Sequence, residues 1–344
     1  MINNSNFTKR DNCRLCSSKS FYSVLKLEST PPANNFVREE DLNKEQKKFP
    51  LELYFCQDCS HLQLPYVVNP NFLFDDYVYV SGTSPVFIKH FGDYANSLIH
   101  NYTPSRNNII IDIGSNDGTF LKFFKDKGYE VLGIDPAIEI SKKANEKGIK
   151  TINSFFDYKL AKQLNLSYPK ASIISANNVF AHADDLVEIL KGVSEILSND
   201  GIFVFEVSYL LDVFEKNLFD TIYHEHLSYH SVKPLEKFFK NNNMQLIDVQ
   251  RISTHGGSIR GIAQLKEGVR KVGSSVGEII SMEEEKQIDK ISTFRDFAEN
   301  INKLKGELTT TLLNLKKKNK KIAGFGAPAK ATTLMYQFDL NKNI

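Results

Sequence analysis

Apolar runs alternate with amphipathic segments through the middle of the chain, from about residue 108 to residue 266. The apolar runs predict strands at 109–113, 130–134, 150–152, 172–176 and 202–207. The segments between them predict helices at 119–127, 138–147, 157–164 and 185–197. Two later runs, 245–251 and 258–264, lie close enough for a hairpin at the sheet edge. The whole pattern predicts an α/β fold, a parallel sheet with helices on both faces.

The flanking segments have other patterns. Residues 1–70 combine two cysteine pairs with a loop-like run and predict a small N-terminal module. An aromatic-rich stretch and a helix at 85–99 open the next domain, which we expect to cover 71–268. Residues 269–344 predict helices, with the acidic run 283–285 on a solvated helix face. A second strand-loop-helix unit begins at 321 and predicts the start of a C-terminal Rossmann-like substrate domain.

Composition narrows the class of protein. The 344 residues are 41% hydrophobic and 24% charged, which is ordinary for a globular protein with a sizeable core. The net charge is only +2, without a long basic block, so binding of nucleic acid through a broad surface is disfavoured. The chain shows neither a signal peptide nor an apolar run of membrane-spanning length, so we expect a cytoplasmic protein without a membrane partner.

All four cysteines lie in the first 59 residues, as Cys13-Arg-Leu-Cys16 and Cys56-Gln-Asp-Cys59. Without a secretion signal, two such pairs indicate a metal site rather than disulfide bonds. Four thiolates suit a closed tetrahedral zinc site, which has no open position for water and is therefore predicted to be structural. Two alternatives remain: buried free cysteines, or His61 in place of Cys59 as a ligand.

A loop of small and acidic residues, Gly114-Ser-Asn-Asp-Gly118, follows the first predicted strand. The strand ends in Asp112, and a second apolar run ends at Asp135, about twenty residues after the loop, as in a nucleoside-binding β-loop-α unit. The loop has neither the lysine of a P-loop nor the third small residue of a dinucleotide site. An acidic loop repels a pyrophosphate and suits a positively charged ligand such as S-adenosylmethionine (SAM).

Each residue of this unit has an expected role. Asp112 is predicted to orient the loop and meet the cofactor's amino group, and Asp135 to bind both ribose hydroxyls. Gly114 and Gly118 allow close backbone approach. The cofactor-binding prediction also includes Asn116 and Asp117, although Asp117 can instead be a helix N-cap. A different α/β nucleotide-binding fold is the alternative for the whole constellation.

Polar residues follow the fourth and fifth strands, whose carboxyl ends face the ligand crevice of an open parallel sheet. Asn177, Asn178 and His182 follow the fourth strand, and the motif Tyr223-His-Glu-His226 follows the fifth. A histidine accepts protons near neutral pH, a carboxylate can orient it, and a tyrosine hydroxyl can donate to an oxyanion. Several alternatives stay open: a hydrated loop at 219–226, a metal site at 224–226, a surface position for His182, and a plain turn at 255–257.

In order along the chain, these motifs resemble the sugar C-methyltransferases over nearly the full length. The resemblance is carried by Cys13-x-x-Cys16, Cys56-x-x-Cys59, Asp112-x-Gly-x-Asn-Asp-Gly118, Ile222-Tyr-His-Glu-His226, His255-Gly-Gly257 and Gly324-Phe-Gly-Ala-Pro-Ala-Lys330. It implies an N-terminal zinc domain, a class I SAM-dependent methyltransferase (Rossmann-like) core and a C-terminal Rossmann-like domain. Because family members usually continue for several strand-helix units beyond the last motif, we expect a truncated C-terminal segment.

The resemblance also implies an activity. The family methylates C3 of nucleotide-linked 4-keto-deoxysugars, so the expected partner is a nucleotide sugar. His226 matches the general base, with Tyr223 and Glu225 beside it, and His182 and Tyr77 match further active-site positions. The family often has Asp where His224 stands, so His224 receives no role. Two alternatives are O-methylation of a sugar, which needs a base but no ketone, and a non-catalytic zinc-containing scaffold with a degenerate core.

Overall fold

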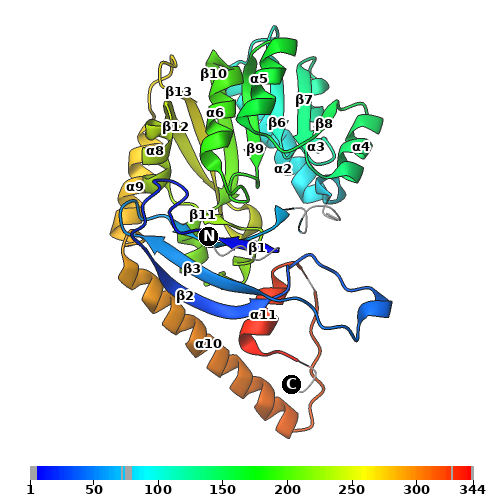
Figure 1. Ribbon diagram of the computed structural model, residues 1–344, viewed down its shortest axis with the longest axis vertical. Coiled ribbons are helices and arrows are strands. Elements are labelled where there is room, and N and C mark those ends of the chain that lie inside the picture. Colours follow the sequence, from blue (N-terminus) through cyan, green and yellow to red (C-terminus); the bar gives the residue numbers. More distant parts are fainter. Residues whose placement is uncertain (1–5, 71–72, 74–79, 327, 342–344) are drawn as a thin grey trace.

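The computed structural model describes residues 6–70, 73, 80–326 and 328–341. Its largest part is a seven-stranded sheet with the order β12-β13-β10-β9-β6-β7-β8 (Figure 1). The parallel members of this sheet are β6 (Ile109–Ile113), β7 (Glu130–Asp135), β8 (Thr151–Asn153), β9 (Ala171–Asn177) and β10 (Leu197–Ser208). Each predicted strand is therefore confirmed, and the ends agree to within one residue except in β10, which begins at 197 rather than 202.

Helices cover both faces of this sheet, as the alternating pattern predicted. Ile109 and Ile111 face a core shared with α5 (Tyr158–Ser167), α6 (Leu186–Ile196) and α8 (Val232–Asn241). Ile110 faces the opposite core, shared with α2 (Pro85–Tyr102) and α3 (Thr119–Lys125). The sheet is buried on both sides, and this is why its strands are continuous apolar runs rather than alternating ones. The remaining helix between strands is α4 (Ile138–Glu146), and α7 (Leu210–Glu215) follows β10.

The predicted hairpin forms the far edge of the sheet. Strand β13 (Ser258–Leu265) is antiparallel to both β10 and β12 (Met244–Ile252). Between its strands lies the His255-Gly256-Gly257 segment, where all three residues have positive φ. A Cβ on Gly257 would lie 2.3 Å from the carboxyl carbon of Asp212, so only glycine fits there.

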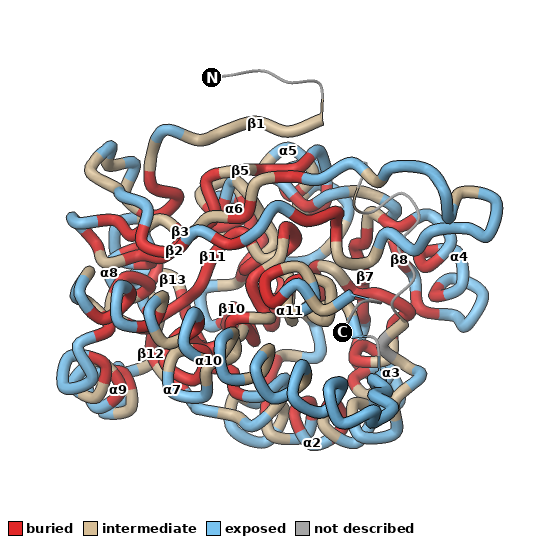
Figure 2. The backbone as a smooth tube through the Cα atoms, turned by 90° about the horizontal axis from the view of Figure 1, so that it is seen from below, coloured by how far each residue is buried: buried red, intermediate tan, exposed pale blue. Residues whose placement is uncertain are grey.

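The N-terminal residues build a second, smaller sheet with the order β11-β4-β3-β2. Its strands are β2 (Phe21–Thr30), β3 (Phe49–Cys56) and β4 (Leu62–Gln63), while β1 (Phe7–Lys9) pairs with β5 (Tyr66–Val68). Its fourth strand, β11 (Ser228–Tyr229), comes from the segment directly after His226. One hydrophobic core runs through both sheets, and Figure 2 shows buried residues from β2 and β3 through to β10. The N-terminal module is thus joined by strand pairing to the segment after His226, and by packing to the larger sheet.

The C-terminal residues form α9 (Ser274–Glu285), the long α10 (Ile291–Lys317) and α11 (Ala331–Phe338). Figure 1 shows α10 running along the β2 side of the small sheet. The helix of the predicted strand-loop-helix unit is α11, but described residues 321–326 form no strand. Instead α11 packs on the small sheet and the motif segment: Gln337 Oε1 accepts from the Glu28 amide at 2.8 Å, and Thr333 Oγ1 donates to the Ile222 carbonyl at 2.7 Å.

The acidic run at the end of α9 is not wholly solvated. Glu284 and Glu285 are exposed, but Glu283 is 1% exposed. Its two carboxylate oxygens accept from the amides of Val232 at 2.6 Å and Lys233 at 3.0 Å, the first turn of α8. For Glu283 the expectation of a solvated helix face was wrong, because free amides at a helix start attract a carboxylate. Within the described residues, no helix combines the length and apolar character needed to cross a membrane.

Candidate active site

A cavity of about 220 Å³ opens at the carboxyl edge of the parallel strands β6, β7 and β9. Seven of the sequence-predicted site residues line it: Asp112, Gly114, Asn116, Asp135, Asn177, Asn178 and His182. Apolar side chains close much of the remaining wall, among them Phe87, Phe91, Phe120, Phe156 and Ile189. These seven residues therefore lie at the carboxyl ends of the parallel strands, where such sheets bind their ligands.

The loop after β6 passes close to neighbouring side chains and has little room for side chains of its own. Gly114 has φ +68°, and a Cβ there would lie 2.2 Å from Cγ2 of Val179, so this position excludes any side chain. Asn116 also has positive φ, at 50°. Asp135 fixes the loop from β7, because its Oδ2 accepts from the Asn116 amide and its Oδ1 from the Ala137 amide, both at 2.9 Å. A carboxylate offers about four acceptor sites, so Asp135 keeps lone pairs for ligand hydroxyls.

Two buried carboxyl groups give the cavity an affinity for cations. Asp112 accepts from Ser175 Oγ at 2.6 Å, and burial raises its pKa to about 7. Burial also raises the pKa of Asp135. Both shifts arise because water no longer stabilises the charged form. A positively charged ligand restores that stabilisation, which is the property expected of a site for the amino and sulfonium groups of SAM.

Polar atoms in the loop region are left without partners inside the described structure. Both Oδ1 and Nδ2 of Asn177 are buried and unpaired, and so is Oγ of Ser115, another cavity residue. Buried polar groups normally have hydrogen-bond partners. A ligand that carries both hydrogen-bond donors and acceptors satisfies these atoms, and SAM carries both.

Two predicted cofactor residues lie behind the cavity rather than on its wall. Asp117 accepts from Thr119 Oγ1 at 2.6 Å and pairs with Lys147 at 2.8 Å. Asp117 is not the N-cap that was its alternative role; it precedes the cap of α3 by one residue and bonds to the side chain of Thr119 in the first turn. Gly118 is the N-cap of that helix with φ +76°, and a Cβ would lie 2.8 Å from Ile149. A third predicted residue, Tyr77, lies outside the described residues.

The Tyr223–His226 motif does not line the cavity. It lies next to it, because His226 contacts His182 on the cavity wall. The ring centroids of His182 and His226 are 5.0 Å apart, and those of His226 and Tyr223 are 4.1 Å apart. Nδ1 of His226 lies 2.7 Å from the backbone carbonyl of Thr221. Because a carbonyl only accepts, Nδ1 carries the proton and Nε2 carries the lone pair. His226 thus presents an accepting nitrogen, with its ring beside the histidine on the cavity wall.

Burial keeps both histidines neutral. It lowers the pKa of His226 to about 4, while the hydrogen bond to Thr221 acts in the opposite direction. Burial also takes the pKa of His182 well below its usual value, and the nearby His226 and His255 lower it further. At neutral pH, His226 therefore has its accepting nitrogen available for a proton.

The other two motif residues face the N-terminal module. Oε1 of Glu225 accepts from Asn34 Nδ2 at 2.7 Å, and burial raises the pKa of this carboxyl group. His224 donates from Nε2 to the Phe49 carbonyl at 3.3 Å and is 1% exposed. His224 therefore packs against β3 of the small sheet. Among the described residues, only the cysteines form a cluster of potential metal ligands, so the alternative metal site at 224–226 has no support.

Sequence reasoning missed a buried charge network beside the cavity. Glu206, near the end of β10, accepts from Nε2 of His90 at 2.8 Å and from Nε of Arg260 at 2.7 Å. Phe87, a cavity residue on the same helix as His90, contacts His255 with the ring centroids 4.8 Å apart and the rings tilted by 39°. In the sequence, the one sign of this network was Glu206 itself, an acidic residue near the end of an apolar strand. Its partners come from α2 and β13, which no local pattern connects to it.

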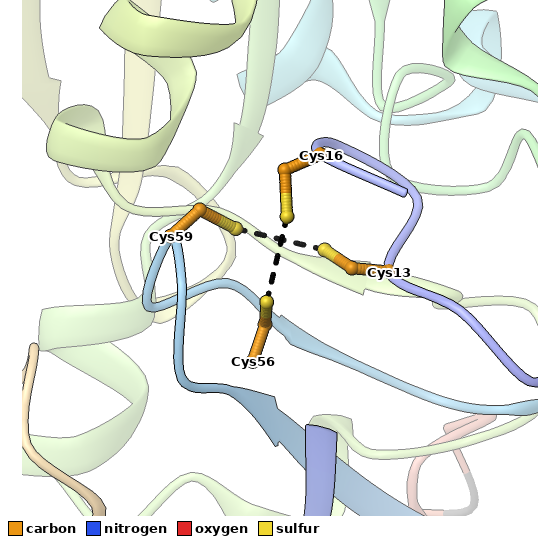
Figure 3. A group of neighbouring side chains, drawn as sticks. All are labelled: Cys13, Cys16, Cys56 and Cys59. Atoms are coloured by element: carbon orange, nitrogen blue, oxygen red, sulfur yellow. Dashed lines mark hydrogen bonds between the residues drawn. The ribbon is translucent and has the colours of Figure 1, made fainter. Parts of the chain in front are cut away.

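The four cysteines meet in one place, with their sulfur atoms pointing toward a common centre (Figure 3). All four Sγ atoms lie within 4.8 Å of one another; Cys13 and Cys59 are 3.6 Å apart, and Cys16 and Cys56 are 3.5 Å apart. Zinc–sulfur bonds of about 2.3 Å in a tetrahedron require separations of about 3.8 Å, so the residues fit Zn²⁺. His61 lies 3.2 Å from Ser228 Oγ and stacks on His230, and the complete cysteine set leaves it no ligand role.

Comparison with known proteins agrees with this geometry. Three family models match the chain: "Putative zinc binding domain" over 13–74, "Methyltransferase domain" over 88–249 and "C-methyltransferase C-terminal domain" over 253–344. A curated relative, C-methyltransferase NovU of Streptomyces niveus, is 31% identical over 325 residues, which are 94% of this chain and 77% of the relative.

Solved structures similar to this chain cover about half of it. One is an S-adenosylmethionine-dependent methyltransferase from Clostridium acetobutylicum, 16% identical, covering 53% of this chain and 92% of its own, with a TM-score of 0.42. Another is the PH0226 protein from Pyrococcus horikoshii, 15% identical, covering 55% of this chain and 95% of its own, with a TM-score of 0.44.

Proposed function

This chain belongs to the sugar C-methyltransferase family and is a SAM-dependent C-methyltransferase with a zinc-binding domain, and we propose that it methylates C3 of a nucleotide-linked 4-keto-deoxysugar. The observation that carries the proposal is the His226 imidazole, held by the Thr221 carbonyl at 2.7 Å and packed against His182 on the cavity wall. A base at this point suits an acceptor carbon whose hydrogen is acidic. A carbon next to a ketone has such a hydrogen.

The cavity residues hold the cofactor in this proposal. Asp135 binds the ribose hydroxyls, Asp112 faces the positively charged amino acid part, and the unpaired amide of Asn177 supplies a donor and an acceptor. SAM, when bound, supplies an electrophilic methyl group. The protein's contribution is to align the two carbon centres and exclude water, and such alignment is worth several kcal/mol (roughly 7–11 at most).

The sugar is activated by proton transfer. The C4 ketone acidifies the C3–H bond, and Nε2 of His226 removes that proton as the C3–H electrons move toward the carbonyl oxygen. Nδ1–H keeps its bond to the Thr221 carbonyl and stabilises the imidazolium that forms. The Tyr223 hydroxyl donates to the enolate oxygen. We propose that His182, on the cavity wall, contacts the substrate, and that Glu225 supports the motif beside His226 through its hydrogen bond with Asn34.

Hydrogen exchange at the sugar tests the proposal. The protein is incubated in heavy water with a nucleotide-linked 4-keto-deoxysugar and no SAM, and deuterium at C3 is measured by NMR and mass spectrometry. We expect exchange with wild type, none above background with His226→Gln, and a methyl group at C3 once SAM is added. Methylation of a sugar oxygen, or methylation at carbon without any C3 exchange, would show that this mechanism is wrong.

A further inference from the structure

We propose that Arg14 is a positioning residue for the reaction, because its side chain ties the zinc loop to both segments that carry the active-site histidines. Arg14 lies between the zinc ligands Cys13 and Cys16 and is 3% exposed. The inference rests on the proposed roles of His226 and His182. The inference adds that the zinc module helps to align these two histidines.

The guanidinium group contacts both histidine segments directly. Its Nη1 donates to the carbonyl of Leu227, the residue after His226, at 3.1 Å. Its Nε donates to Oδ1 of Asp184, two residues after His182, at 3.0 Å. A single planar group thus fixes the distance between the two segments.

Further hydrogen bonds make the arrangement rigid. The Ser228 amide donates to the Ala181 carbonyl at 3.0 Å, which joins the same two segments along their backbones. On the zinc side, the backbone amide of Arg14 donates to Oε1 of Gln63 at 2.8 Å, and Nη1 also donates to the Leu64 carbonyl at 2.6 Å. Arg14 is therefore the point where the zinc loop, the small sheet and the two histidine segments meet.

Arginine suits this task better than lysine does. Its rigid fork offers five donors in fixed directions, whereas a lysine ammonium is a point charge on a flexible chain. Displacement of a catalytic group by about 1 Å can cost roughly 100-fold in rate. Because the cysteine thiolates that bind zinc fix both ends of the loop, the position of Arg14 depends on that metal site.

The test compares Arg14→Lys with Lys19→Met, a control that removes a charge from an exposed residue just beyond the same loop. For Arg14→Lys we expect kcat to fall about 10- to 100-fold, with zinc content unchanged and SAM affinity within about twofold by calorimetry. Amide hydrogen exchange in peptides covering 180–184 and 226–230 is expected to accelerate. The control is expected to match wild type in every measurement.

Asp184→Ala provides a second variant, since this side chain is 40% exposed and its loss is tolerated more easily than that of a buried group. Unchanged kcat in a folded, zinc-loaded Arg14→Lys or Asp184→Ala protein overturns the inference. Asp184 also pairs with Arg10, so if Arg14→Lys does not fold, Asp184→Ala is compared with Arg10→Met. A kcat lower in Asp184→Ala than in Arg10→Met, with full zinc in both, supports the inference, and equal kcat values overturn it. The amide exchange needs no sugar, so it tests the role of Arg14 even if wild type fails the heavy-water experiment on the proposed function.

Discussion

Nδ1 of His226 donates to the backbone carbonyl of Thr221 at 2.7 Å, and this one bond determines which nitrogen of the ring can act as a base. The carbonyl comes from the short 3-10 turn Phe219–Thr221, so the bond is local and independent of any ligand. It orients the ring toward His182 and leaves Nε2 with its lone pair. The same segment packs against α11, where the rings of Phe219 and Phe338 are 5.1 Å apart.

Replacing His226 by Gln is expected to reduce methyl transfer by about 100-fold or more, the usual contribution of a general base. Affinity for SAM should stay near wild type, because His226 does not line the cofactor cavity. Turnover is measured by mass spectrometry and SAM binding by calorimetry. His100→Gln, an exposed histidine on α2, is the matched control. Near-normal turnover of His226→Gln would contradict its assignment as the base.

Asp135→Asn is expected to weaken SAM binding about 10- to 100-fold, since a hydrogen bond to a charged group contributes about 1.5–3 kcal/mol. The matched control is Asp117→Asn. It changes an acid of the same unit that pairs with Lys147 instead of lining the cavity. The control should lower the melting temperature with little effect on the dissociation constant measured by calorimetry. If both variants weakened SAM binding equally, Asp135 would have no greater part in binding SAM than Asp117.

The protein should lose stability as the pH falls from about 6.5 to about 4. Burial lowers the pKa of His224, His226 and His230 to about 4. In that window the unfolded chain binds protons at these histidines and the folded chain does not, so the free energy of unfolding rises with pH and falls on acidification. Melting temperatures at several pH values measure this effect.

Acid also weakens zinc binding, because the thiolates become protonated, so the slope of wild type alone does not isolate the histidines. The difference between variants does. His226→Gln removes one group that contributes to the slope, and the melting temperature of this variant should depend less steeply on pH than that of His100→Gln. Identical slopes would show that His226 does not gain its proton on unfolding.

Strands β6 to β10 of the large sheet were predictable because they are buried parallel strands, and such strands are short apolar runs between turn signals. The cavity residues followed from one topological rule, that strand ends face the crevice. Contacts between distant segments were not predictable. Asn34 reaches Glu225 and Arg14 reaches Leu227 across more than half of the chain, and no local periodicity records such pairs. The pairing of β11 with β4 belongs to the same class, because a two-residue strand has no pattern of its own.

Each chain is expected to bind one zinc ion through its four thiolates. Metal analysis of protein prepared without added metal should give about one zinc per chain, and Cys56→Ser should lower this value. Because β3 ends at Cys56 and the small sheet continues into β11 beside His226, loss of zinc should also expose that sheet to proteolysis. Gln57→Ala, which changes an exposed side chain of the same loop, is the control. Full zinc content in Cys56→Ser would mean that this thiolate is not a ligand.

Glu283→Gln should destabilise the folded protein by about 1–3 kcal/mol, the cost of weakening hydrogen bonds to a buried charged acceptor. The carboxylate accepts from the amides of Val232 and Lys233 and from the Tyr209 hydroxyl at 3.0 Å, so it connects α9 to the start of α8 and to the residue after β10. An amide in its place offers only one acceptor oxygen and must leave at least one donor unpaired. Glu285→Gln, on the exposed side of the same turn, should change stability by less than about 0.5 kcal/mol in urea denaturation. If both variants unfold at the same urea concentration, the buried carboxylate contributes nothing beyond its exposed neighbour.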